Sequence, residues 1–119
     1  ISDIKLARNK SMNGELLDGE KPEDFSELPE YGINVYANGY KIIRKYAILN
    51  ASAEPVEVKE DIQITTLTPQ YALSTPVDVF YFERISGKTQ EITLYLNDNH
   101  GNSREISINE DSLITLKEI

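Results

Sequence analysis

Cysteine and tryptophan are both absent from this chain of 119 residues. Without cysteine the chain forms no disulfide, carries no thiolate nucleophile and lacks the usual ligands of a structural zinc site. Without tryptophan it lacks the largest aromatic ring that can stack on a sugar. These absences exclude several catalytic and metal-dependent classes of protein, but they do not decide the cellular compartment.

Histidine occurs once, at His100, in a polar segment at residues 97–103. A catalytic triad or a histidine general base would have to use this residue, and no Gly-x-Ser-x-Gly nucleophile motif accompanies it. We therefore expect His100 to be an exposed, dispensable turn residue and the protein not to be an enzyme. Carboxylate pairs of the glycosidase kind arise by chance among 20 acidic residues, so a small hydrolase is only a secondary alternative.

The same polar segment is rich in oxygen ligands, which raises the question of calcium. An EF-hand loop with Gly101 at its sixth position would have Leu96 at its first, where aspartate is required. A site formed by Asp98, Asn97 and a carboxylate of a neighbouring loop is an alternative. The simpler interpretation is that asparagine and glycine are there to form a turn. We expect no metal and no cofactor.

The chain has no apolar run of about 18 residues or more, which argues against a membrane-spanning helix. The N-terminus has no apolar run of the kind that a signal peptide contains. Because the chain begins at Ile1, we expect a processed form or an excised domain. An extracytoplasmic location is expected, meaning secreted, periplasmic or on the cell surface.

Acidic residues outnumber basic residues by 20 to 12, which gives a net charge of −8. The resulting field repels nucleic acid and anionic membranes, so neither is an expected partner. Seven of the acids fall between Glu15 and Glu30, where Lys21 is the only base. Gly19 and two prolines lie in the same stretch, and Gly14 directly precedes it. Residues 1–30 are therefore predicted to form an irregular acidic arm, and residues 31–119 the β domain.

Residues 22–28 are predicted to form a short helix within the arm, because a proline stands at a suitable first helical position and two acids follow it in the first turn. Phe25 and Leu28 would lie on one face of it. We expect this pair to close the open end of the β domain; the alternative is an acidic docking segment that becomes ordered on a partner. Apolar residues at the start of the chain predict one short strand, formed by Ile1, Ile4 and Leu6.

From Tyr31 onward, valine, isoleucine, threonine and tyrosine recur at every second position, a pattern typical of half-buried antiparallel strands. Asn38-Gly39 predicts a type I′ hairpin turn. A bulge is expected at residues 59–61, because Glu60 would otherwise face the core as an unpaired carboxylate. Residues 77–85 are apolar on both faces, which predicts a central strand. The fold class is therefore all-β: an antiparallel, immunoglobulin-like β-sandwich of about seven or eight strands.

The predicted core consists of residues that keep one parity within each strand. They are Ile42, Tyr46, Ile48, Val56, Val58, Ile62, Ile64, Val79, Tyr81, Ile92, Leu94, Leu96, Ile106 and Ile108. Alanine at Ile64 or at Leu94 is accordingly expected to cost roughly 2–5 kcal/mol of stability.

An excess of tyrosine, seven against three phenylalanines, is the one compositional sign of a binding function. Aromatic rings beside cations can recognise protein or glycan. The alternative is that these tyrosines pack within the sheet and leave their hydroxyls at its rim. The candidate binding surface surrounds the first hairpin and comprises Tyr36, Tyr40, Lys41, Arg44, Lys45 and Tyr46.

The expected protein is a non-catalytic β-sandwich module for protein or glycan interaction or for structural support. Recognition would use loops or strand edges and needs no cofactor. The main alternative is an assembly subunit of a virion, pilus or secretion apparatus that uses strand or arm exchange. The second alternative is the small hydrolase or calcium-dependent domain considered above. The pattern indicates neither the partner nor the oligomeric state.

Overall fold

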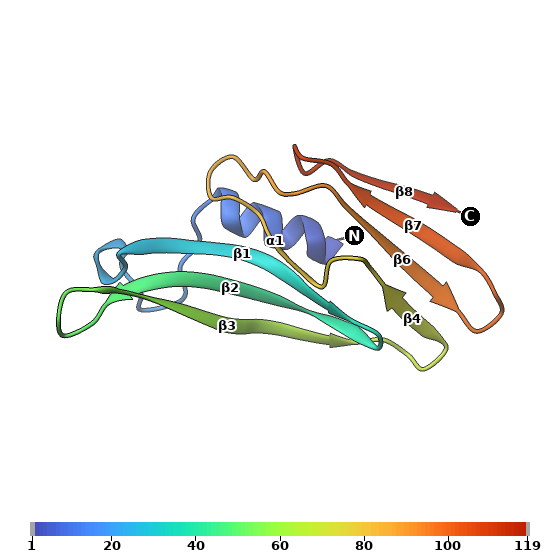
Figure 1. Cartoon of the computed structure of the whole chain (residues 1–119), viewed down its shortest axis with the longest axis horizontal. Coiled ribbons are helices and arrows are strands. Elements are labelled where there is room, and N and C mark those ends of the chain that lie inside the picture. The colour runs from blue at the N-terminus through green and yellow to red at the C-terminus, as the bar shows by residue number, and fades with distance from the viewer. Residues whose placement is uncertain (1, 119) are drawn as a thin grey trace.

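Figure 1 shows the computed structural model, which describes residues 2–118. These residues form one α-helix, one 3₁₀ turn and eight strands in two antiparallel sheets of four. The first sheet has the order β3-β2-β1-β5, with strands β1 (Glu27–Tyr36), β2 (Gly39–Leu49), β3 (Pro55–Thr66) and β5 (Val79–Tyr81). The second has the order β4-β6-β7-β8, with strands β4 (Tyr71–Ser74), β6 (Ile92–Asp98), β7 (Ser103–Ile108) and β8 (Ile114–Glu118). The protein is thus mostly β, as the sequence predicts.

The helix α1 (Ser2–Met12) lies between the two sheets (Figure 1). Its buried residues, Ile4, Ala7 and Ser11, recur at helical spacing and face the interior. A helix of this length is marginal alone in water, so tertiary burial stabilises it. The strand predicted at the start of the chain is therefore wrong, apart from Ile1, which lies outside the described residues.

The segment between α1 and β1 contains less helix than the sequence predicts. Only the 3₁₀ turn Pro22–Asp24 forms there, and Phe25 already has an extended backbone. β1 begins at Glu27, so Leu28 is a strand residue rather than a helical one. The β region consequently starts ahead of the boundary predicted at Tyr31.

The β1–β2 hairpin forms where it is predicted, but its turn consists of Ala37 and Asn38, while Tyr36 pairs with Gly39. Neither turn residue has a positive φ, so the turn is not of type I′. Gly39 serves a different purpose, because a Cβ atom there would lie 2.3 Å from the carbonyl oxygen of Thr65. The glycine lets β3 approach β2 closely.

β3 contains a bulge, but not at residues 59–61, where the sequence predicts it: these residues pair regularly with β2, and Glu60 stays on the inner face, paired with Arg44. Asp61 and Gln63 pair with consecutive residues of β2, which leaves Ile62 as the extra residue. An extra residue reverses the inward and outward alternation beyond it. Ile64 therefore points to the outer face and is 61% exposed, so its predicted place in the core is wrong.

β5 is a short edge strand and not the central strand predicted over residues 77–85. It pairs with β1 through three residues only. Phe80 and Phe82 enter the core, whereas Val79 is exposed and Tyr81 half-buried, so the predicted inner face of this strand is reversed. Gly32 of β1 permits this pairing, because a Cβ there would lie 2.1 Å from the carbonyl oxygen of Phe80.

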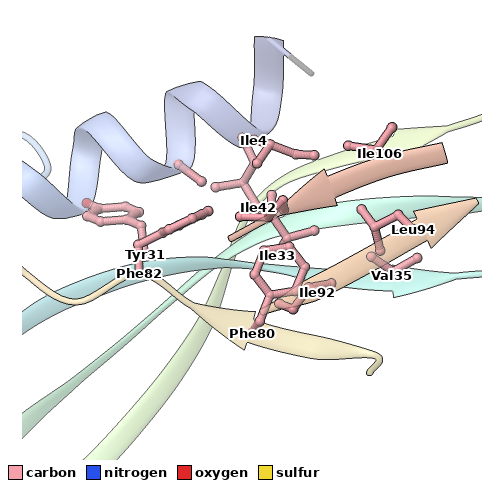
Figure 2. Close-up of a cluster of buried hydrophobic side chains, with 12 residues drawn as sticks. Ile4, Tyr31, Ile33, Val35, Ile42, Phe80, Phe82, Ile92, Leu94 and Ile106 are labelled. Carbon is pink, nitrogen blue, oxygen red and sulfur yellow. The ribbon is translucent and has the colours of Figure 1, made fainter. Parts of the chain in front are cut away.

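Side chains from α1 and both sheets form one hydrophobic core (Figure 2). Figure 2 shows Ile4 descending from α1 toward Ile42, and Leu94 lying beside Val35. The cluster comprises Ile4, Ala7, Tyr31, Ile33, Val35, Ile42, Phe80, Phe82, Ile92, Leu94, Ile106 and Ile108.

The predicted core is confirmed at Ile42, Ile92, Leu94, Ile106 and Ile108. Other predicted members are exposed, including Ile48 at the end of β2 and Val56 at the start of β3. The reason is one of shape: the molecule is 55 Å long, and the first sheet extends past the elements that cover it (Figure 1). The remaining predicted members are half-buried: Tyr46, Val58, Ile62, Tyr81 and Leu96.

Two alanine substitutions, one at a buried leucine and one at an exposed isoleucine, are expected to distinguish the core from the outer face of the sheet. Leu94→Ala should lower the free energy of unfolding by about 2–5 kcal/mol, because Leu94 is 3% exposed and the change leaves a cavity. Ile64→Ala should cost less than about 1 kcal/mol. Urea unfolding of both variants measures the difference. Equal losses at the two positions would contradict the register described for β3.

Candidate interaction surfaces

Arg44 is a buried charge at the centre of the first sheet, with 1% of its side chain exposed. Its Nη1 and Nη2 donate to the two carboxylate oxygens of Glu20 at 2.8 and 2.7 Å. Its Nε donates to Glu60 at 2.6 Å. Glu20 comes from the segment before β1 and Glu60 from β3, so Arg44 joins three parts of the chain. We call these three residues the Arg44 cluster.

The electrostatics of the Arg44 cluster follow from its hydrogen bonds. The bond from Arg44 lowers the pKa of the Glu20 carboxyl below its ordinary value, although burial opposes the change. The backbone N–H of Leu17 also donates to Glu20, at 2.7 Å, which fixes the loop around Gly19. The guanidinium further lies over the ring of Tyr46, 4.8 Å from its centroid. With its donors already engaged, Arg44 has a structural role.

The structure divides the predicted binding surface between the two faces of the first sheet. Side chains alternate along a strand, and the pairing of Arg44 with Tyr31 and Glu60 fixes which parity faces inward. Tyr40, Arg44 and Tyr46 therefore lie on the inner face. The residues on the outer face are Tyr36, Lys41 and Lys45.

The outer-face cations have partners of their own. Lys41 forms an ion pair with Asp61 at 3.1 Å. Lys45 lies over the ring of Tyr81, with its Nζ 4.4 Å from the centroid, and 3.9 Å from a carboxylate oxygen of Glu30. Burial raises the pKa of Tyr81, so its ring stays neutral under the ammonium. Contacts of this kind at an exposed surface contribute little to stability.

Of the predicted docking pair, Phe25 packs on Tyr46 of the first sheet, and Leu28 is part of that sheet, in β1. The rings of Phe25 and Tyr46 meet edge to face, with 5.1 Å between their centroids. The N–H of Ser26 then donates to the carbonyl oxygen of Ala47 at 2.8 Å. Both members of the pair are half-buried. Within residues 2–118, this segment is held on its own chain.

The segment at residues 97–103 forms a tight turn closed by Asp98. Its carboxylate accepts the backbone N–H groups of His100 and Asn102, each at 2.9 Å, and the side-chain amide of Asn102 at 3.1 Å. The bond from the Asn102 backbone is the main cause that lowers the pKa of Asp98. His100 itself is exposed. In the described part of the chain, no group of three or more carboxylate, histidine or cysteine side chains has a metal-binding arrangement.

β3 forms the longest open edge of either sheet. The order β3-β2-β1-β5 makes it the outermost strand, paired with β2 through eleven residue pairs. The other outer strands, β5, β4 and β8, have only three, four and five residues. An unpaired strand edge presents backbone N–H and C=O groups to solvent and serves as a template for another strand.

The outward-facing backbone groups of β3 can be assigned from the pairing. The carbonyl oxygen of Asn38 accepts from Leu67 on the β3 side, so even-numbered residues of β2 point toward β3. Their partners on β3 include Val58, opposite Tyr46. Because direction alternates along an antiparallel strand, Glu57, Lys59 and Ile64 direct their backbone groups away from β2.

Two signals in the sequence indicate the Arg44 cluster when they are combined. Arg44 interrupts an apolar face of β2, and Glu60 interrupts the matching face of β3; the two residues are paired neighbours. Two opposite charges that lie next to each other on the inner side of neighbouring strands are expected to form an ion pair. Glu20, by contrast, lies in a loop without periodicity, and nothing in the local pattern assigns its partner.

The chain matches no protein-family model, and comparisons with curated proteins and with solved structures found no match. Within residues 2–118, no helix is both long and apolar enough to cross a membrane. The class defined by the fold is therefore a mostly β protein of two facing four-stranded antiparallel sheets with a helix inserted between them.

Proposed function

We propose that this protein is a non-catalytic interaction module that binds an extended segment of a partner protein along β3. The observation that carries the proposal is the open edge of β3, twelve residues long. Strand addition supplies main-chain hydrogen bonds for affinity and side-chain contacts at alternate positions for specificity. We propose further that the protein recognises its partner as immunoglobulin-like domains do, through a strand edge or a loop and without a cofactor.

Features of β3 favour a selective partner over unspecific pairing. Pro55 begins the strand, the bulge at Ile62 bends it, and Lys59 lies on its edge. Each of these devices limits accidental edge-to-edge association. The outer-face side chains Glu57 and Asp61 flank Lys59, so the edge is acidic on balance. The segment that fits best alternates apolar β-branched residues with basic ones.

Two variants at one position test the proposal. Lys59→Pro removes an outward N–H without removing a hydrogen bond to β2, whereas Lys59→Ala removes the charge and keeps the N–H. Random peptides of about twelve residues are displayed and selected for binding to the wild-type protein. The selected peptides are expected to bind the Lys59→Ala variant and not to bind the Lys59→Pro variant. Hydrogen exchange should show new protection at Glu57, Lys59 and Ile64. Equal binding to both variants would reject strand addition.

A second candidate function, an assembly subunit, is favoured by the charges of the same edge. If two copies pair β3 strands in antiparallel fashion about Val58, Glu57 of each copy lies opposite Lys59 of the other. Opposite charges in such cross-strand pairs are stabilising. Sedimentation should then show a dimer that Lys59→Glu disrupts and Lys59→Glu with Glu57→Lys restores. A monomer at all concentrations would leave the peptide-binding module as the function.

A further inference from the structure

A cavity of about 210 Å³ lies between the two sheets, at the end of α1 that carries Asp3 and Ile4. A helix with its side chains is roughly 10 Å wide, as large as the whole spacing of two packed sheets. α1 lies between the sheets (Figure 1), and the cavity lies at its first turn, where Asp3 and Ile4 form part of the lining.

Most of the cavity wall is apolar. Val35 of β1 lies on one side, and Leu73, Leu94 and Leu96 of β4 and β6 lie on the other; Figure 2 shows the relation of Val35 to Leu94. An engineered apolar cavity of about 150 Å³ binds benzene. The volume here accommodates a single ring with a short substituent.

One polar pair lies at the wall of the cavity. The hydroxyl of Tyr40 donates to the carboxylate of Asp3. Burial is the main cause that raises the pKa of Tyr40, and this hydrogen bond is the second, so the hydroxyl keeps its proton. An ionised carboxylate can accept about four hydrogen bonds. Asp3, in the first turn of α1, therefore has capacity for a donor brought by a ligand.

We propose that this cavity binds a small primary amine with an apolar ring, whose ring lies against Leu73 and Leu96 and whose ammonium meets Asp3. The net charge of −8 favours a cation over an anion throughout the surrounding field. A ligand carboxylate would be repelled by Asp3. This site is separate from the β3 edge, and the proposal does not depend on the one made for that strand.

The choice of probes tests the charge preference. Benzylamine, toluene and benzoate share one ring and differ in the charge of the substituent. Titrations followed by nuclear magnetic resonance are expected to show benzylamine binding about tenfold more tightly than toluene, and benzoate binding least. Asp3→Asn should lower the affinity for benzylamine to that for toluene and leave toluene unchanged. Failure of benzylamine to bind, or a preference that survives Asp3→Asn, overturns the proposal.

The location of the site is tested by filling the cavity. The chain has no tryptophan, so a single introduced indole also reports its own environment by fluorescence. Leu73→Trp should reduce the affinity for benzylamine and toluene at least tenfold, whereas the matched Ile64→Trp, on the exposed outer face, should leave both unchanged. Should Leu73→Trp not fold, Val35→Phe fills the same space. Equal affinity in the filled and control variants overturns the assignment.

Discussion

Replacing Glu20 with glutamine is expected to lower the free energy of unfolding by about 2–3 kcal/mol at neutral pH. The guanidinium of Arg44 is buried and donates twice to Glu20, so the neutral amide leaves the charge with Glu60 as its remaining carboxylate. Urea unfolding provides the measurement. The matched control is Glu15→Gln, which removes a more exposed ion pair with Lys10 and should cost less than about 1 kcal/mol.

The Glu20 contribution also depends on pH, in a direction set by its lowered pKa. The native state binds a proton at this carboxyl less readily than the unfolded chain does. The stabilisation is therefore complete above the unfolded-state pKa of about 4.3 and is lost as the pH falls through the lower folded-state pKa. The difference in the free energy of unfolding between the wild type and Glu20→Gln should therefore become smaller at acidic pH. A difference that stays constant to about pH 2 would show that the carboxylate's charge is irrelevant.

Replacing Ser11 with alanine is expected to cost about 2–4 kcal/mol, because two buried backbone groups lose their partner at once. The hydroxyl of Ser11 donates to the carbonyl oxygen of Phe82 at 2.5 Å and accepts from the N–H of Tyr31 at 3.1 Å. It bridges β1 and the chain that leaves β5, next to the direct bond from the N–H of Phe82 to the carbonyl oxygen of Tyr31 at 2.9 Å. Thermal and urea unfolding measure the loss.

Ser26→Ala provides the comparison for this substitution, since Ser26 is exposed and should be neutral within about 0.5 kcal/mol. Hydrogen exchange at Tyr31 offers a second measurement, because its amide should exchange faster in Ser11→Ala. If Ser11→Ala and Ser26→Ala are equally stable, the hydroxyl bridge does not contribute to holding α1 on the sheets.

The strands of this fold are predictable because a half-buried strand shows its period over few residues. β6 and β7 are examples: Ile92, Leu94, Ile106 and Ile108 alternate with polar residues and are buried as expected. The sequence predicts the bulge in β3 for the wrong reason, because Glu60 keeps its inward place with Arg44 as its partner; the consequence for Ile64 depends on which residue is extra. One position of difference moves every later side chain to the opposite face.

The helix α1 was not predictable from its own residues. Ile4 and Ala7 are apolar, but the third buried position holds Ser11, whose polarity hides the helical period. Its burial is compensated by backbone groups of Tyr31 and Phe82, which are distant in the sequence. Local propensity is a weak guide where tertiary contacts of this kind decide.

The candidate surfaces were predictable only in part, for a related reason. Tyr40 and Lys41 are adjacent in sequence, yet neighbouring residues of a strand face opposite ways. A cluster in sequence is therefore not a cluster on a surface. The open edge of β3 follows from the order of strands in the sheet, which no local pattern contains.

The contact of α1 with the last hairpin has a consequence for how the protein is made. Arg8 donates to the carbonyl oxygen of Ser112 at 2.9 Å, a contact that spans 104 positions of the chain. At translation rates of about 5–20 residues per second, the ribosome needs roughly 5–20 s to synthesise the second partner after the first. During that interval α1 and the first sheet are already synthesised, but β6 to β8 are not complete, so part of the sheet's inner face stays uncovered. Hydrophobic surface exposed in this way makes a nascent chain prone to aggregation, and long-range closure of this kind makes folding slow.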